Sequence, residues 1–268
     1  GRRPDPDAGR PPPATAAGLV RGPASRYFCF FFKQKTAYEM RFWDMLRATR
    51  QSPGGIAAKA IAGVDCALLD VKAKALGISV TELFGGPTRD KVRVYWSHCG
   101  TSRARHSDLL GVPAIRTMED ISDLGREVVR RGFTALKTNI VIPGDPATVY
   151  GGGFARGPGT TDGAVTTPIL RHIENLIGTF RDAVGPDVDI SLDLNFNFKP
   201  ESCIRIAKVL EQFDLLWLEL DMYSPEAILQ IRQSTHTKIC TGENLFYPRE
   251  YLPYFQQHSA DIFMIDVP

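Results

Sequence analysis

The first regular pattern in the chain is an apolar spacing of three and four residues that starts after Gly55. Ile56, Ala60, Ile61 and Val64 open the series. This period places apolar side chains on one face of a helix. Gly77 follows the series and predicts the end of the helix, because glycine readily adopts the left-handed conformation of a C-cap.

A second, shorter helix is expected at residues 79–84. Ser79 stands at the N-cap position and Glu82 follows three residues later, which is the spacing of a capping box. The Gly85-Gly86-Pro87 turn ends this helix. Beyond it the chain repeats a unit of about 25 residues, in which a β-branched and aromatic run, a loop and a helical period follow one another.

The alternation of strands and helices continues to the last residue. The expected strands are 92–99, 134–139, 188–194, 215–220, 238–243 and 261–267, and the expected helices are 118–131, 168–184, 200–212, 225–233 and 248–257. Several of these helices open with proline, which suits a first helical turn. The alternation predicts parallel strands with right-handed crossovers, either in an open doubly wound sheet or in a closed barrel. No GxGxxG turn follows the first strand, which disfavours a dinucleotide-binding sheet.

Composition and charge narrow the possible partners. The 268 residues, of which 43% are hydrophobic, suffice for one large domain or for a barrel with a small companion domain. A formal net charge of +2 provides no field that favours nucleic acid, and no apolar run reaches the roughly 18 residues of a membrane-spanning helix. The five cysteines lie far apart without a CxxC pair. This argues against disulfides and a thiolate zinc site, and we expect a cytoplasmic protein.

The first forty residues differ from the rest. Residues 1–25 are rich in Pro, Arg, Ala and Gly without apolar periodicity, and we expect disorder there. Residues 32–40 follow a run of phenylalanines and, when back-translated, resemble a sequencing-library adapter. We therefore interpret 1–40 as a disordered or foreign segment and expect the native reading frame to begin near Arg41. The alternative is an exposed strand or a membrane-touching patch formed by the phenylalanines.

Three acidic residues end consecutive strands. Asp193 and Glu219 are 26 residues apart, and Glu243 follows Glu219 by 24, one strand-helix unit each. In a barrel these positions lie side by side at the C-terminal mouth, where barrel active sites are found. Three carboxylates there would repel one another without a cation, and an oxygen-only ligand set favours Mg²⁺. One such acid alone would be a loop residue or a helix cap, so the shared register indicates the site.

Two more charged residues occupy equivalent positions. Asp266 ends the last run, 23 residues after Glu243, and Lys137 lies in an otherwise apolar strand. A lysine is costly to bury there without a partner. A metal-bound anion would supply that partner.

These segments resemble the mandelate racemase and muconate lactonizing enzyme branch of the enolase superfamily. The matching segments are Gly63-Val64-Asp65-Cys66-Ala67-Leu68-Leu69-Asp70, Glu82-Leu83-Phe84-Gly85-Gly86 with Arg89, Leu136-Lys137-Thr138-Asn139, Asp193-Leu194-Asn195, Trp217-Leu218-Glu219 and Thr241-Gly242-Glu243-Asn244. The resemblance implies an N-terminal capping domain that closes over a (β/α)7β barrel. It also implies that Asp193, Glu219 and Glu243 bind Mg²⁺, and that Asp266 pairs with a histidine on the next strand as an acid-base group.

Departures from the family pattern bear on the reaction. The family's Lys-x-Lys pair is Lys137-Thr138-Asn139 here, which is similar to galactonate dehydratase and favours dehydration of a sugar acid. Asn195 resembles an asparagine of mandelate racemase, where galactonate dehydratase would have a histidine. The usual Glu-Pro after the second metal acid is replaced by Leu220-Asp221.

The resemblance also assigns roles to individual residues. Lys137 binds the substrate carboxylate and stabilises developing charge, and Asp266 orients a histidine that this chain does not contain. We assign substrate contacts to Asn139, Asn195 and His98.

The fold class expected is α/β, with an incomplete (β/α)7β TIM-type barrel at 91–268 that contains about six of eight strands. A helical remnant of an α+β capping domain at 41–90 precedes it. The expected function is Mg²⁺-dependent abstraction of the proton alpha to a carboxylate, followed by loss of the β-hydroxyl, as in a sugar-acid dehydratase that gives a 2-keto-3-deoxy acid. The alternatives are a racemase, epimerase or cycloisomerase on the same scaffold, and an inactive, truncated, chimeric gene product.

Further expectations concern assembly and the remaining motifs. Unpaired strand edges predict that the present chain aggregates, and the missing histidine opposite Asp266 predicts that it is inactive. The full-length protein is expected to be a homo-oligomer that binds a small-molecule carboxylate. The glycine-rich segment 151–163 is interpreted as a mobile lid in preference to a phosphate cradle. Residues expected in loops or in structural and packing roles are His106, His172, His236, His258, Cys99 and Cys240.

Overall fold

The computed structural model describes residues 42–52, 54–151 and 163–266. The expected foreign segment 1–40 and most of the glycine-rich segment 151–163 lie outside these residues. Within the described ranges, no helix has both the length and the apolar character needed to cross a membrane.

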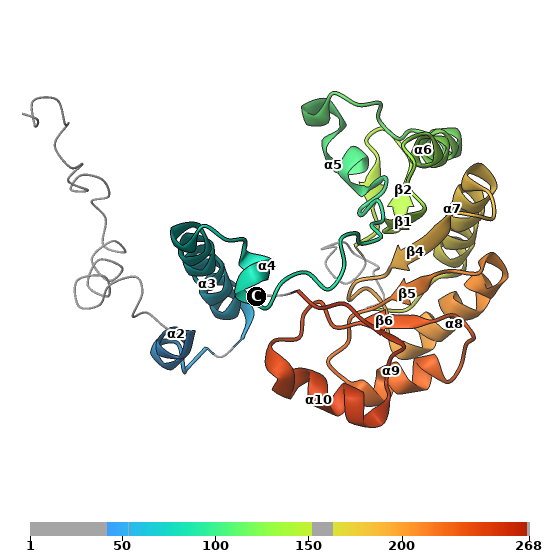
Figure 1. The fold of residues 1–268 in the computed structure, drawn as a ribbon. Coiled ribbons are helices and arrows are strands. Elements are labelled where there is room, and N and C mark those ends of the chain that lie inside the picture. Colours follow the sequence, from blue (N-terminus) through green and yellow to red (C-terminus); the bar gives the residue numbers. More distant parts are fainter. Residues whose placement is uncertain (1–41, 53, 152–162, 267–268) are drawn as a thin grey trace, which may run out of the picture.

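A parallel sheet of five strands forms the centre of the molecule, in the order β1-β4-β5-β6-β7 (Figure 1). These strands are β1 (Ala135–Thr138), β4 (Asp189–Asp193), β5 (Trp217–Glu219), β6 (Ile239–Thr241) and β7 (Ile262–Phe263). Consecutive strands in the chain are neighbours in the sheet once β2 and β3 are set aside, and a helix lies between each pair. The sheet and its helices form the incomplete barrel that the alternating pattern predicted.

The helices that connect the strands agree with those expected. They are α6 (Met118–Arg130), α7 (Thr167–Val184), α8 (Pro200–Leu210) followed by the 3-10 turn η1 (Glu211–Phe213), α9 (Pro225–Arg232) and α10 (Tyr247–Gln257). Proline occupies the first or second position of α7, α8, α9 and α10. All five expected barrel helices are confirmed, with ends within two residues of the predicted ones.

The strands separate an apolar side from a polar side. Leu136, Ile190, Leu192, Leu218 and Ile239 are fully buried and belong to one core cluster that includes the following side chains of α7: Ile173, Leu176, Ile177, Phe180 and Val184. Burying each such side chain contributes about 1.5–3 kcal/mol. Side chains alternate along a strand, so the positions between these apolar residues point to the barrel interior, and those positions carry the charged groups.

The prediction of a regular strand at 92–99 was wrong. A single parallel bridge joins Trp96 to Leu136, supported by hydrogen bonds from Trp96 N to Ala135 O and from Lys137 N to Trp96 O, both 2.9 Å long. Val92 and Val94 are exposed. The segment lies alongside β1 through this bridge. No described strand lies on its other side to extend the pairing.

Two elements were missed. Helix α5 (Thr101–Leu110) occupies a stretch expected to be a loop, so the placement of His106 in a loop was wrong. This helix has no apolar face, and its backbone at His106 is non-helical, which explains the absence of a periodic signal. The hairpin of β2 (Val141–Ile142) and β3 (Thr148–Val149) is too short to show a strand period.

In the described part of the chain, three helices precede the barrel, namely α2 (Phe42–Ala48), α3 (Gly55–Leu76) and α4 (Val80–Leu83). Gly77 ends α3 in the left-handed conformation with φ of 69°, and both hydrogen bonds of the capping box between Ser79 and Glu82 are present. These two predictions are confirmed. The helices meet the barrel through the rings of Phe42 and Tyr247, whose centroids are 6.2 Å apart.

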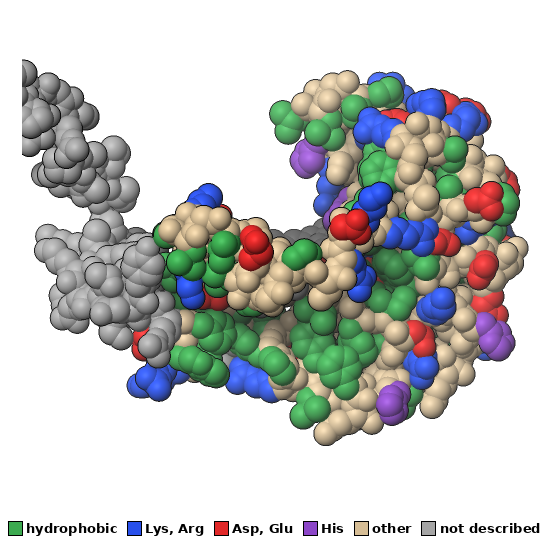
Figure 2. All heavy atoms as spheres, viewed as in Figure 1, with side chains coloured by type: hydrophobic (Ala, Val, Ile, Leu, Met, Phe, Trp, Pro, Cys, Tyr) green, Lys and Arg blue, Asp and Glu red, His purple; other side chains and the backbone are tan. Residues whose placement is uncertain are grey.

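Apolar side chains gather near the last strand. Leu252 and Phe255 of α10 and Ile265 after β7 are exposed, and Figure 2 shows a broad hydrophobic area on the face that carries α10. β7 pairs with β6 alone among the described strands. The outer edge of the sheet is therefore open here.

Close packing of α6 against α7 makes a specific prediction. A Cβ placed on Gly125 of α6 would lie 2.7 Å from Ala183 Cβ, whereas a Cβ on Gly178 of α7 meets only the Phe213 ring, at 3.4 Å. Alanine favours a helix over glycine by about 1 kcal/mol, but overpacking costs about 1–3 kcal/mol. We expect Gly125→Ala to lower the free energy of unfolding in urea by up to about 2 kcal/mol. Gly178→Ala should leave it unchanged or higher, and equal effects of the two would contradict this packing.

Candidate metal centre

The three acids singled out in the sequence converge at one end of the sheet. Asp193 ends β4 and Glu219 ends β5, and the two residues are direct partners in the parallel register. Glu243 follows β6 by two residues. One carboxylate oxygen from each of Asp193, Glu219 and Glu243 lies within 4.8 Å of the others. The convergence expected from the spacing is therefore present in the structure.

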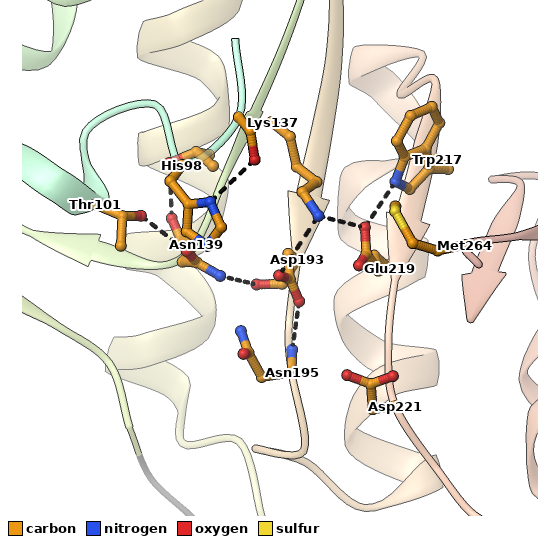
Figure 3. Close-up of polar contacts among 12 residues, drawn as sticks. His98, Thr101, Lys137, Asn139, Asp193, Asn195, Trp217, Glu219, Asp221 and Met264 are labelled. Carbon is orange, nitrogen blue, oxygen red and sulfur yellow. Dashed lines mark hydrogen bonds and ion pairs between the residues drawn. The ribbon is translucent and has the colours of Figure 1, made fainter. Parts of the chain in front are cut away.

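Lys137 reaches the same group from β1. Its Nζ donates a hydrogen bond of 2.9 Å to Glu219 Oε2 and lies 3.9 Å from Asp193 Oδ2 (Figure 3). The side chain is buried. Burial alone would lower the pKa of Lys137, but the charges of Glu219 and Asp193 outweigh it and raise the pKa. Lys137 therefore stays a cation at neutral pH.

Glu219 is held with one oxygen paired and one free. Oε2 accepts hydrogen bonds from Lys137 and from Trp217 Nε1, the second at 3.2 Å. Oε1 is buried and has no hydrogen-bond partner among the residues that the structure describes. Burial and the neighbouring charge of Asp193 raise the pKa of Glu219, against the opposing effect of Lys137. A buried carboxylate oxygen without a donor is costly, and a cation beside it would remove that cost.

These residues fit a divalent cation with oxygen ligands. Three carboxylates within bonding reach of one point, one of them with an orphaned oxygen, match the hard ligands that Mg²⁺ prefers. The carboxylate of Asp193, at the end of β4, is held in place by a hydrogen bond of 2.8 Å from Asn195 N to its Oδ1. Partners that orient metal ligands in this way are a general feature of metal sites.

Asn139 and Asn195, expected to contact substrate, both lie beside Asp193 (Figure 3). Asn139 is buried, accepts a hydrogen bond of 2.8 Å from Thr101 Oγ1 and donates one of 3.3 Å to Asp193 O. Asn195 adopts the left-handed conformation with φ of 52°, a conformation asparagine tolerates better than most residues. Thr101, which positions Asn139, lies in the missed helix α5 and was not identified from the sequence.

The other two predicted site residues are His98, which Figure 3 shows beside Asn139, and Asp266. His98 is exposed, has a φ of 51°, and its Nδ1 lies 3.0 Å from Ser97 Oγ. The Asp266 side chain is 57% exposed and lies 3.8 Å from Lys59 Nζ. Neither residue belongs to the group of acids that could share an ion. Their roles remain predictions.

Asp221 is a site residue that the sequence analysis did not assign. It lies two positions after Glu219 and is buried, and Asn244 Nδ2 donates a hydrogen bond of 3.2 Å to its Oδ2. Burial, followed by the charges of Asp193, Glu243 and Glu219, raises the pKa of Asp221 to about 7. The alternation of Trp217, Glu219 and Asp221 along β5 and beyond it was a signal that could have identified this position.

Comparison with known proteins identifies the family. Residues 120–268 match the family described as "Enolase C-terminal domain-like". Residues 33–85 match "Mandelate racemase / muconate lactonizing enzyme, N-terminal domain". The chain belongs to the mandelate racemase and muconate lactonizing enzyme family. The resemblance inferred from the strand-end motifs is confirmed.

Curated relatives within this family are sugar-acid dehydratases. A D-gluconate dehydratase of Thermoproteus tenax is 30% identical over 215 residues, which are 78% of this chain and 37% of that protein. The D-galactonate dehydratase family member ManD of Chromohalobacter salexigens is 30% identical over 218 residues, which are 75% of this chain and 49% of that protein. The chain thus spans about half or less of the length of these relatives.

A solved structure of the family has a different assigned reaction. It is a proposed L-alanine-DL-glutamate epimerase from Burkholderia xenovorans strain LB400, 38% identical, with a TM-score of 0.79, and the match covers 84% of this chain and 57% of that one. Another structure of that epimerase contains magnesium and fumarate. The family members therefore include proteins assigned to both reaction classes.

Magnesium should stabilise the folded protein through the three carboxylates. A ligand that binds the folded state alone, at about 100 times its Kd, adds about 2.7 kcal/mol to the free energy of unfolding. We expect Mg²⁺ to raise the melting temperature of the unaltered protein. Glu219→Gln should abolish this rise, whereas Asp182→Asn, at an exposed position of α7, should leave it unchanged. An equal rise in both variants would place the ion elsewhere.

Proposed function

We propose that this protein abstracts the proton next to a carboxylate with the help of Mg²⁺, and that it acts on sugar acids as a dehydratase. The observation that carries the proposal is the convergence of Asp193, Glu219 and Glu243 beside the buried ammonium of Lys137. In this proposal the three acids hold the ion and Lys137 faces the substrate carboxylate. Asn139, Asn195 and His98 contact the rest of the substrate.

The chemistry explains why so much charge is gathered at one mouth. Loss of the α-proton places two negative charges on neighbouring oxygens, and a bound Mg²⁺ would supply positive charge to those oxygens. Lys137 contributes a second positive charge, already fixed by its hydrogen bond to Glu219. Positioned charges of this kind cost no reorganisation as the reaction proceeds. The enolase superfamily is the standard example of such a site.

Dehydration follows from the same proton abstraction. The α C–H bond breaks, its electrons form a carbon-carbon double bond, and the β-hydroxyl leaves with a proton as water. The resulting enol becomes a 2-keto-3-deoxy acid. Two findings favour this outcome: the Lys137-Thr138-Asn139 strand, and relatives at about 30% identity that are sugar-acid dehydratases. In our proposal Asp266 orients a histidine that assists departure of the hydroxyl.

Epimerisation is the second candidate, favoured by one observation. The structure at 38% identity is a proposed epimerase, and return of the proton to the opposite face of the same carbon would invert the centre without loss of water. The two reactions share every step up to removal of the proton. They differ in product, because only dehydration yields a 2-keto acid.

Product analysis distinguishes the candidates. The full-length protein would be incubated with Mg²⁺ and a panel of hexonic and pentonic acids, and the products assayed for 2-keto acids and for change of optical rotation. We expect a 2-keto-3-deoxy acid from at least one sugar acid. Inversion of a substrate without keto acid would favour the epimerase, and neither product from an Mg²⁺-binding protein would count against both.

Lys137→Met should separate the roles of Lys137 and the acids. Removing the ammonium deletes charge that acts most strongly when the substrate becomes doubly anionic, so the loss should appear in turnover. We expect kcat to fall by at least about 10²-fold, as for loss of an electrostatic group at a reacting oxygen. Mg²⁺ affinity, measured by calorimetry, should change far less or increase. Unchanged turnover would remove Lys137 from the mechanism.

A further inference from the structure

Asp221 extends the row of interior side chains along β5 toward the mouth of the barrel. Trp217, Glu219 and Asp221 are at alternate positions and therefore share one side of the strand. A hydrogen bond of 3.3 Å from Asp221 N to Asn195 O joins the backbone at Asp221 to the segment that follows β4. Figure 3 shows the Asp221 carboxylate beside Glu219 and near Asn195.

The Asp221 carboxylate is buried but has few hydrogen-bond donors or positive charges around it. It is 6% exposed. In the described part of the chain, its side chain accepts one hydrogen bond, from Asn244 to Oδ2, and forms no ion pair. Lys137, the buried cation of this mouth, is directed to Glu219. Burying a carboxylate with so few donors is costly, so a further donor is expected when the site is filled.

Two alternative roles for Asp221, helix capping and metal binding, do not hold. It does not cap the following helix, because Ser224 Oγ performs that role for α9 by accepting from Ala227 N. It is also outside the group of three acids whose oxygens lie close enough to share an ion. The carboxylate is thus left with neither a capping role nor a metal-binding one among the described residues.

Asp221 lines a small hollow. Its lining includes Phe196, Tyr223 and Asn244 together with Asp221. The rings of Phe196 and Tyr223 have centroids 5.4 Å apart, and Tyr223 is 70% exposed. An acid flanked by two rings and an amide, one residue layer beyond the metal-binding oxygens, is suited to contact a substrate that leaves the metal site in this direction.

We propose that Asp221 determines specificity by accepting a hydrogen bond from a donor group on the carbon chain of the substrate, an ammonium or a hydroxyl. This rests on the proposed function, which places the substrate carboxylate at the metal and Lys137. The three metal acids are balanced in charge by a divalent ion and Lys137, so Asp221 adds an uncompensated negative charge. It therefore favours a donor, most strongly a cationic one, and disfavours a second anionic group.

Binding of three six-carbon acids tests this assignment. D-gluconate offers hydroxyl donors along its chain. D-glucosaminate carries an ammonium in place of the 2-hydroxyl and keeps the other hydroxyls, and hexanoate has no donor on its chain. Their affinities would be measured by calorimetry with saturating Mg²⁺ for the full-length protein and for its variants Asp221→Leu, Asp221→Asn and Asp182→Asn. The last is a matched control, since Asp182 is exposed on α7. Mg²⁺ affinity and circular dichroism would be recorded for each.

The expected result is a preference for a donor-bearing acid over hexanoate that Asp221→Leu reduces by about tenfold or more, as expected for a hydrogen bond to a charged group. Hexanoate and Mg²⁺ binding should change less than about threefold. If the donor is a hydroxyl, Asp221→Asn keeps most of the gluconate affinity, because its amide oxygen still accepts. If the donor is an ammonium, Asp221→Asn weakens glucosaminate as strongly as Asp221→Leu does.

Other outcomes separate failure of this inference from failure of the proposed function. An unchanged preference in Asp221→Leu, or equal weakening of all three acids, overturns the role of Asp221 and leaves the metal site intact. Absence of Mg²⁺-dependent binding of any of the acids to the unaltered protein overturns the proposed function, and the inference with it.

Discussion

The repulsion among three carboxylates at one barrel mouth is the constraint on which the rest of the site depends. Their oxygens lie within 4.8 Å of one another, and two of the acids, Asp193 and Glu219, are buried. Lys137 offsets part of this repulsion through its contacts with both. Burial, followed by the charge of Asp193, raises the pKa of Glu219 in spite of Lys137. A divalent cation would complete the balance of charge, which would link folding of this mouth to the chemistry proposed for it.

The parallel register delivers these groups. Asp193 pairs with Glu219 across β4 and β5, and Lys137 pairs with Ser191 one layer below. Because neighbouring strands run in the same direction, their carboxyl ends meet at one edge, and the helices on the outside supply the apolar packing that maintains this register. A shift of one residue in any of these strands would turn a charged side chain into the core.

The sequence predicted those features that have a strong local signal. The barrel helices were found from their period and opening prolines, and the acids from their repeat of one strand-helix unit. Helix α5 could not be found because it has no apolar face, and the strand at 92–99 was overestimated because β-branched composition does not reveal whether a strand has a partner on both sides. Asp221 was noted as a departure from the family, but its burial beside Asn244 is a tertiary property.

A crystal structure of the protein with Mn²⁺ in place of Mg²⁺, with anomalous scattering recorded, tests the central claim most directly. Mn²⁺ accepts the same oxygen ligands and can be located without assumptions about its partners. The account predicts one strong anomalous peak among the carboxylates of Asp193, Glu219 and Glu243, with Lys137 Nζ in the same mouth. A peak that contacts fewer than two of these acids, or no peak at this end of the sheet, would contradict it.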